Sequence, residues 1–293
     1  MNQVFTVTGT GSAMRLDALL ASRLGISSAE ARRLLDAGAV RVDGRTYGLR
    51  DKGNRLPPGA AVEVTAPLAT PQPQAELLVP ILAQGPGWVA VDKPAGMPVH
   101  PLRPGERGTV LNFLVACFAN ILGIGEGSLR SGVVHRLDVE TSGVLLFATN
   151  QPTWDLLRAA FAGHTARKTY RAVVRGHLRG QGRCDLPLVV GRHRPAKVRV
   201  IDGPHSRMCG LRWRAVQVLR DATLVEVDLE TGFLHQIRAT FAHFGHPVLG
   251  DKVYGRADAP RLMLHASRVQ AGPAEAFSPD PEDFSRALRD RLV

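Results

Sequence analysis

Chemically versatile side chains gather in one short segment, His135-Arg136-Leu137-Asp138-Val139-Glu140-Thr141-Ser142-Gly143, which lies between two apolar runs. Loops at strand ends commonly display reactive groups. Asp138 could serve as a nucleophile or a base, although a lone loop aspartate is more often a turn residue. Ser142 lacks the G-x-S-x-G spacing of a nucleophile elbow. From the residues alone, hydrolysis by Asp138 and one of the ten histidines is an alternative, but no second motif supports it.

The whole segment closely resembles the H-R-L-D-x-x-T-S-G signature of the RluA-type pseudouridine synthases. Three other stretches of the chain match the same family in the family's order. They are Val91-Asp92-Lys93-Pro94-Ala95-Gly96 through His100-Pro101, Arg167-Lys168-Thr169-Tyr170-Arg171-Ala172, and Glu230-Thr231-Gly232 through Asp251-Lys252-Val253-Tyr254-Gly255. The resemblance covers about residues 78 to 270.

The resemblance implies a role for each matching position. Asp138 would be the catalytic aspartate that attacks the target uridine, so that the glycosidic bond breaks and the uracil rejoins the ribose through carbon five. Tyr170 would stack on the uracil and transfer a proton at carbon five. Arg238 would pair with Asp138 and keep it ionised. Arg136 would enter the base stack that the target leaves, and His135 beside it is also expected to bind RNA.

No redox step or external energy is needed for this isomerisation, so we expect neither a metal nor an organic cofactor. His243-x-x-His246 could suggest a metal site, but two histidines without a third ligand more often pack or form hydrogen bonds.

Two positions depart from the family pattern T-G-R-x-H-Q-I-R-x-H. Phe233 stands where the family has a cation, and Thr240 stands where it has a histidine. Neither position is the aspartate, the tyrosine or the paired arginine. We therefore expect the chemistry to be retained while RNA contacts differ. A catalytically silent RNA-binding or ribosome-assembly factor is the alternative that these two changes favour.

The elements that must position these residues are short strands with a few helices. Their mixed spacing, without regular βαβ alternation, predicts an α+β fold with a mixed, largely antiparallel sheet flanked by helices and loops. The expected strands are 88–91, 144–148, 169–174, 211–218 and 224–229, and the expected helices are 109–121, 153–163 and 235–244.

A smaller α/β unit precedes this domain. Leu16, Leu19, Leu20 and Leu24 share one helical face, Ser27 and Glu30 have capping-box spacing for a second helix, and short strands are expected at 40–42 and 62–64. The stretch resembles the alpha-L RNA-binding domain of a small-subunit ribosomal protein. The cations expected to contact RNA there are Arg15, Arg32, Arg33 and Arg41; a merely solvated helix surface is the alternative.

The domain boundaries follow from composition. Pro67 to Gln74 reads PLATPQPQ, which has three prolines and no charge, as is typical of a linker. We expect an RNA-binding domain at 1–66, a linker at 67–77 and the catalytic domain at 78–293.

The 293 residues carry a net charge of +11, which indicates a polyanionic partner. Arginine greatly outnumbers lysine, and a GC-rich genome could cause that bias. The bias does not explain the surplus of cationic over acidic residues. The interval from Arg192 to Arg214 holds seven cations and only Asp202 as an acid, so it tracks an RNA backbone or forms a solvated basic loop. We expect RNA as the partner. Large-subunit ribosomal RNA is the first candidate, and transfer RNA is the alternative.

Cysteine spacing and hydropathy indicate where the protein works. The three cysteines show no metal or disulfide spacing, and no segment has the length of a membrane span. We therefore expect a cytoplasmic monomer that does not bind membranes.

Overall fold

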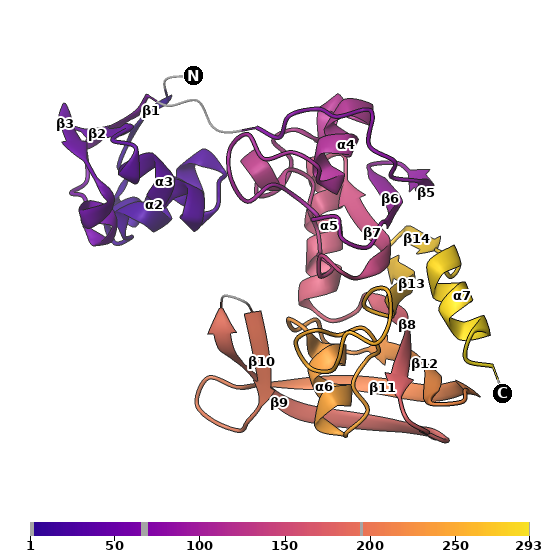
Figure 1. The fold of residues 1–293 in the computed structure, drawn as a ribbon. Coiled ribbons are helices and arrows are strands. Elements are labelled where there is room, and N and C mark those ends of the chain that lie inside the picture. The colour runs from indigo at the N-terminus through magenta and orange to yellow at the C-terminus, as the bar shows by residue number, and fades with distance from the viewer. Residues whose placement is uncertain (1–2, 66–69, 194–195, 293) are drawn as a thin grey trace.

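The chain forms two units, each with its own sheet and apolar core (Figure 1). The computed structural model describes residues 3–65, 70–193 and 196–292. The core of the first unit ends at Val64 and that of the second begins at Val79. The predicted linker begins within residues 66–69, which lie outside the described residues. Its later part packs on the second unit, where the amide of Gln74 donates to the carbonyl of Asn112 at 2.9 Å. The boundaries at 66 and 78 stay predictions.

The first unit pairs a small antiparallel sheet with helices. Its strands run in the order β1-β4-β2-β3. The four predicted leucines are buried in its core. Ser27 caps its helix as predicted, accepting from the amide of Glu30 at 3.2 Å, whereas the Glu30 carboxylate accepts from the Ser128 hydroxyl of the second unit. The elements are β1 (Gln3–Thr6), α1 (Gly9–Ser12), α2 (Leu16–Leu24), α3 (Ser28–Asp36), β2 (Val40–Val42), β3 (Arg45–Tyr47), the 3-10 helix η1 (Leu49–Gly53) and β4 (Ala61–Val64).

In the described part of the second unit, ten strands form one sheet in the order β10-β9-β11-β12-β8-β13-β7-β6-β5, with β14 paired to β13. The pair β7–β13 is parallel and the other pairs are antiparallel, so the predicted mixed α+β sheet is confirmed. The strands are β5 (Ile81–Gly85), β6 (Trp88–Lys93), β7 (Ser142–Ala148), β8 (Arg167–Arg175), β9 (Gln181–His193), β10 (Ala196–Val200), β11 (Arg207–Val218), β12 (Ala222–Leu229), β13 (Leu264–Ala271) and β14 (Ala274–Phe277).

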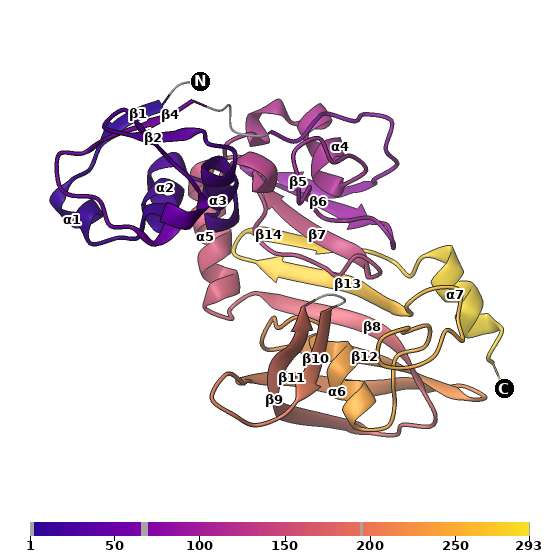
Figure 2. The ribbon, with the colours of Figure 1, turned by 60° about the vertical axis from the view of Figure 1, so that its left-hand side comes forward.

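The helices of the second unit are α4 (Val110–Cys117), η2 (Ala119–Ile121), η3 (Ser128–Arg130), α5 (Gln151–Ala162), α6 (Gln236–His243) and α7 (Glu282–Arg289). The helix expected over 109–121 ends at Cys117 and continues as the 3-10 turn η2. The sequence reading missed β5, β9, β10, β13, β14 and α7. Helix α5 packs on β7 and β13, and α6 lies against the β9–β12 half of the sheet (Figure 2).

Strand β7 directly follows the segment that contains Asp138. All seven residues of β7 are buried, as expected for a strand covered on both faces. A Cβ added to Gly143, whose φ is +114°, would lie 2.2 Å from the carbonyl oxygen of Ala266 on β13. Only glycine fits there, and its close approach lets the two parallel strands pair directly behind the Asp138 loop.

Candidate active site

The three predicted catalytic residues meet in one cavity of about 610 Å³. Asp138 comes from the loop before β7, Tyr170 from β8, and Arg238 from the first turn of α6. Segments a hundred residues apart in sequence therefore converge on one site. The structure confirms that these residues share a pocket, and their chemical roles stay predictions.

Lys93 holds the Asp138 loop from within the protein. Its side chain is fully buried, and its ammonium donates to the carbonyls of Pro94, Met97 and Val139, each at 2.8 Å. Burial lowers the pKa of Lys93 to about 7, while the nearby Asp138 carboxylate opposes that shift. Three acceptors for three protons favour the ammonium form. The Val91-to-Gly96 motif thus fixes the backbone next to Asp138.

Arg238 bridges two carboxylates. Its Nη1 lies 3.2 Å from Oδ2 of Asp138, and its Nε and Nη2 lie 2.7 and 2.8 Å from the two oxygens of Asp251. Burial opposes the charge of Arg238, but the bonds and charges of the two aspartates outweigh it and raise its pKa. The bridge therefore keeps a cation beside Asp138 and fixes its direction.

Asp251 is the residue of this group that the sequence reading left without a role. Its side chain is completely buried and also accepts from the amides of Val253 and Tyr254 at 2.9 and 3.1 Å. Burial raises its pKa, but the hydrogen bonds and charge of Arg238 outweigh that effect and lower it. The sequence carries a signal for it, because the family-like motif Asp251-Lys252-Val253-Tyr254-Gly255 begins with this carboxylate.

Tyr170 is 7% exposed and lies on β8 between Val227 of β12 and Ala266 of β13. Burial raises its pKa, and the negative charge of Asp138 raises it further. The hydroxyl therefore stays protonated at neutral pH and can donate a proton but cannot begin as a base.

Comparison with known proteins agrees with this arrangement. The family model described as RNA pseudouridylate synthase matches residues 87–243, more than half of the chain, and the S4 domain model matches residues 14–49. The chain belongs to the RNA pseudouridine synthase family. The RluA-type resemblance and the assignment as an isomerase are thereby confirmed, and a small RNA-binding domain precedes the synthase domain.

Relatives and solved structures extend the match. An uncharacterized RNA pseudouridine synthase from Chloroflexus aurantiacus is 36% identical over 98% of this chain and 93% of its own. Ribosomal large subunit pseudouridine synthase D from Zymomonas mobilis is 34% identical over 86% of this chain and 80% of its own. The structure of Human RNA Pseudouridylate Synthase Domain Containing 1 matches with a TM-score of 0.59 at 21% identity, covers 75% of this chain and 98% of its own, and supports the fold.

Arg136 and His135, which lie two and three residues before Asp138, differ in character. Arg136 is exposed and lines the cavity of the synthase, as an RNA-contacting arginine must. The His135 ring instead stacks on Phe161 at 4.4 Å, and its Nε2 accepts from the amide of Leu146 at 2.9 Å. Burial, with the charges of Lys168 and Arg158, lowers the pKa of His135 to about 3. His135 lines the cavity as a neutral ring, so any RNA contact that it makes carries no positive charge.

The four predicted arginines of the S4 domain have different surroundings. Arg15 and Arg32 both bond the buried carboxylate of Asp17, at 3.1 and 2.9 Å. Arg33 donates to the carbonyl of Leu102 in the synthase domain. Arg41 is exposed on β2. Two arginines on one carboxylate leave a net positive charge at this surface, and RNA contact by the four stays a prediction.

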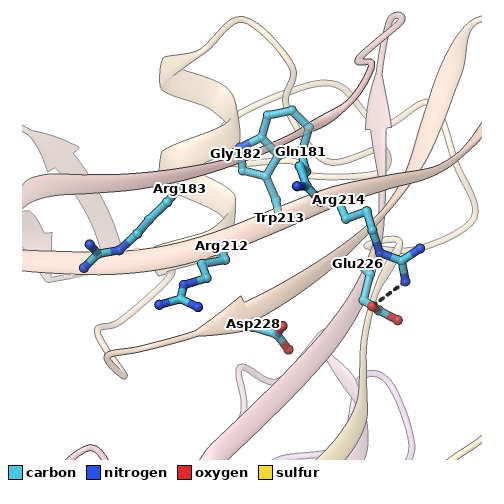
Figure 3. A pocket seen from close by; sticks show the side chains of 8 residues that line it. All are labelled: Gln181, Gly182, Arg183, Arg212, Trp213, Arg214, Glu226 and Asp228. Carbon is cyan, nitrogen blue, oxygen red and sulfur yellow. Dashed lines mark hydrogen bonds and ion pairs between the residues drawn. The ribbon is translucent and has the colours of Figure 1, made fainter.

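The basic interval from Arg192 to Arg214 is strand rather than loop over most of its length, with Arg194 outside the described residues. Arg212 of β11 lies opposite Asp228 of β12 in the strand register. The next positions, Trp213 and Val227, lie opposite each other and in register with Tyr170 of β8. Arg212 and Arg214 therefore project from the face opposite Tyr170. They border a hollow of about 510 Å³, in which Arg214 bonds Glu226 at 2.8 Å (Figure 3). Glu230 pairs with both Arg183 and Arg212. These pairs largely neutralise this hollow.

The two departures from the family pattern differ in their position relative to the cavity. Phe233 lines it and packs against the buried cluster that contains Leu188 and Ala239, while its amide donates to the Gln236 side chain at 3.1 Å. Thr240 is buried within α6. Neither change removes the bridge from Arg238 to the aspartates.

No cluster of three or more His, Cys, Asp or Glu side chains suited to a metal occurs among the described residues, His243 and His246 included. The absence of a cofactor stays a prediction. Across the same residues, no helix is long and apolar enough to cross a membrane.

Proposed function

We propose that this synthase isomerises specific uridines of large-subunit ribosomal RNA in the cytoplasm, with Asp138 as the attacking group. The observation that carries the chemical part is the bridge from Arg238 to Asp138. The bridge engages Oδ2, while Oδ1 has no hydrogen-bond partner within the described residues and is left for the target nucleotide. In the reaction, Asp138 forms a bond to the nucleotide that breaks again before the product leaves. The bond between ribose C1′ and uracil N1 breaks, a new bond forms from C1′ to C5, a base takes the C5 proton and N1 gains a proton.

Tyr170 is suited to the proton steps because its hydroxyl is protonated and its ring lines the same cavity as Asp138. The hydroxyl gives its proton to N1 of the released uracil, and the resulting phenolate then takes the proton that C5 loses. Tyr170→Phe is expected to keep ring stacking and RNA binding but to lower turnover by about 10²-fold, since acid–base groups contribute roughly 10²- to 10⁴-fold. Single-turnover formation of pseudouridine measures the loss of turnover. Tyr47→Phe, in the S4 domain, is the control. Full product yield at the wild-type rate would remove Tyr170 from proton transfer.

Large-subunit ribosomal RNA is favoured as the substrate because relatives from Zymomonas mobilis, Xanthomonas campestris and Nitrosomonas europaea carry the name ribosomal large subunit pseudouridine synthase D. Transfer RNA is the second candidate. The silent RNA-binding factor is disfavoured, since Asp138, Tyr170 and Arg238 meet in one cavity despite Phe233 and Thr240.

Pseudouridine mapping of total RNA tests the substrate. Cells that lack the gene are expected to lose pseudouridine at one or a few positions of large-subunit ribosomal RNA, and the wild-type gene should restore them while an Asp138→Asn gene should not. Loss confined to transfer RNA would replace the proposed substrate. Unchanged pseudouridine in every RNA would contradict the proposed function itself.

Deletion of residues 1–66 tests whether the S4 domain is the element that selects the RNA. A chain lacking residues 1–66 is expected to bind long structured RNA more weakly and with a flatter salt dependence, because each lost phosphate contact lowers the log–log slope by about 0.7 to 0.9. Thermal melting must accompany the measurement, since Glu30 bonds Ser128 of the synthase domain. An unchanged slope with unchanged site selection would assign RNA reading to the synthase domain.

A further inference from the structure

A line of polar contacts runs from strand β10 to the catalytic loop. The amide of Val198 donates to the Tyr254 hydroxyl at 2.7 Å, and that hydroxyl lies 3.1 Å from Nδ1 of His235. On the other side of the ring, Nε2 of His235 lies 3.7 Å from Oδ2 of Asp138. Four segments that are distant in sequence thus meet end to end.

The hydrogen-bonding capacity of each group favours one placement of the protons. The Tyr254 hydroxyl has one proton, and because its oxygen already accepts from Val198 that proton is available for Nδ1 of His235. A neutral imidazole whose Nδ1 accepts carries its own proton on Nε2. In this placement the Nε2–H group faces Asp138.

The charged neighbours of His235 are consistent with a neutral ring. Burial lowers its pKa, the Asp138 and Asp251 carboxylates oppose that shift, and the cations Arg238 and Arg136 add to it. The net shift is downward, so His235 is uncharged at neutral pH.

The surrounding structure holds this ring in a conformation that a free chain avoids. His235 has a φ of +51°, in the left-handed region that costs a non-glycine residue free energy. Its ring meets the Tyr254 ring edge-on with centroids 5.7 Å apart. The Arg238 guanidinium and the Lys197 ammonium in turn lie 5.3 and 5.9 Å from the centre of the Tyr254 ring. Both rings are fixed from several sides.

We propose that His235 is a positioning residue for Asp138 and that Tyr254, held by β10, selects the tautomer that His235 presents. His235 and Arg238 both face Oδ2, and together they turn Oδ1 toward the substrate. The 3.7 Å separation shortens to a hydrogen bond when the target nucleotide fills the cavity, as contacts in unliganded active sites commonly do. The inference rests on the isomerisation at Asp138 and not on which RNA is the substrate.

Nitrogen NMR of the histidine rings tests the tautomer without any RNA. The His235 signals, identified by their loss in His235→Gln, are expected to show Nε2–H in the wild type and a mixture of tautomers in Tyr254→Phe. A wild-type ring protonated on Nδ1 would overturn the inference whatever the substrate proves to be.

Turnover on the RNA that loses pseudouridine in the deletion strain supplies the second test. Tyr254→Phe and His235→Leu are each expected to lower kcat by about 10- to 100-fold, as small misplacements of reacting groups do, with RNA affinity within about twofold. His235→Gln, whose amide can still donate to Asp138, should recover most of the activity. Adding Tyr254→Phe to His235→Leu should cause no further loss, because Tyr254 acts through the ring.

Thr223→Val is the matched control, because this buried hydroxyl also accepts a backbone amide, that of Leu178, yet lies outside the residues that line the cavity. It should lower stability without changing kcat. Full kcat in both Tyr254→Phe and His235→Leu, or additive losses in the double variant, would contradict the positioning role.

Discussion

Asp138→Asn is expected to reduce pseudouridine formation by at least about 10³-fold while leaving RNA affinity within a few-fold. The amide keeps the shape of the side chain but lacks the negative charge that attacks the nucleotide. Affinity depends mainly on phosphate contacts, which this carboxylate does not make. Release of tritium from RNA labelled at uracil carbon five measures the loss, and filter binding measures affinity.

Glu140→Gln is the matched control, because Glu140 is an exposed carboxylate in the same loop that does not line the cavity. It should retain wild-type turnover. An Asp138→Asn protein that turned over near the wild-type rate would contradict the proposed mechanism, and equal losses in the two variants would indicate a damaged loop rather than a missing reactive group.

Arg238→Ala is expected to abolish turnover and also to lower the free energy of unfolding by about 3 to 5 kcal/mol, because it leaves the buried carboxylate of Asp251 without its cation. Arg238→Lys should recover only part of this stability, since a point charge cannot reproduce the two parallel bonds to Asp251 together with the contact to Asp138. Urea unfolding and single-turnover kinetics measure the two effects.

The pH dependence of unfolding separates the buried pair from general damage. The pKa of Asp251 in the folded protein lies below its ordinary value of 3.8, so its contribution to stability is present above that value and is lost as the pH falls through the folded pKa. Without Arg238, burial dominates and raises the pKa of Asp251. Arg238→Ala should therefore unfold at a higher pH than the wild type during acid titration.

Arg291→Ala provides the comparison for Arg238→Ala. The Arg291 side chain is 18% exposed and bonds the carbonyls of Asp258 and Ala287 near the carboxyl terminus. The Arg291→Ala protein should be less stable, while its kcat and the pH at which it unfolds during acid titration stay near those of the wild type. An Arg238→Ala protein with normal stability would show that Asp251 does not depend on the bridge.

The sequence by itself determined the family, the two-unit organisation and the catalytic candidates, because each depends on local residue order. Histidine, arginine and aspartate at fixed spacing before Thr141-Ser142-Gly143 identified the loop. Period and capping predicted that α2 and α3 exist, and they predicted α6 within a residue at each end, since apolar spacing and a Ser27 cap act within one turn.

Only the tertiary structure decided what surrounds the aspartate. In the sequence Lys93 looks like an ordinary lysine, and only the structure shows that its buried ammonium donates to the carbonyl of Val139. Asp251 likewise looks like an ordinary loop acid, and only the structure shows that it pairs with Arg238. The sequence left the interval from Arg192 to Arg214 open as an RNA track or a solvated loop, and only the sheet shows that Arg212 and Arg214 project from the face opposite Tyr170 and pair with acids. Burial, the facing side of a strand and ion pairing across distant segments depend on long-range contacts, which local spacing does not encode.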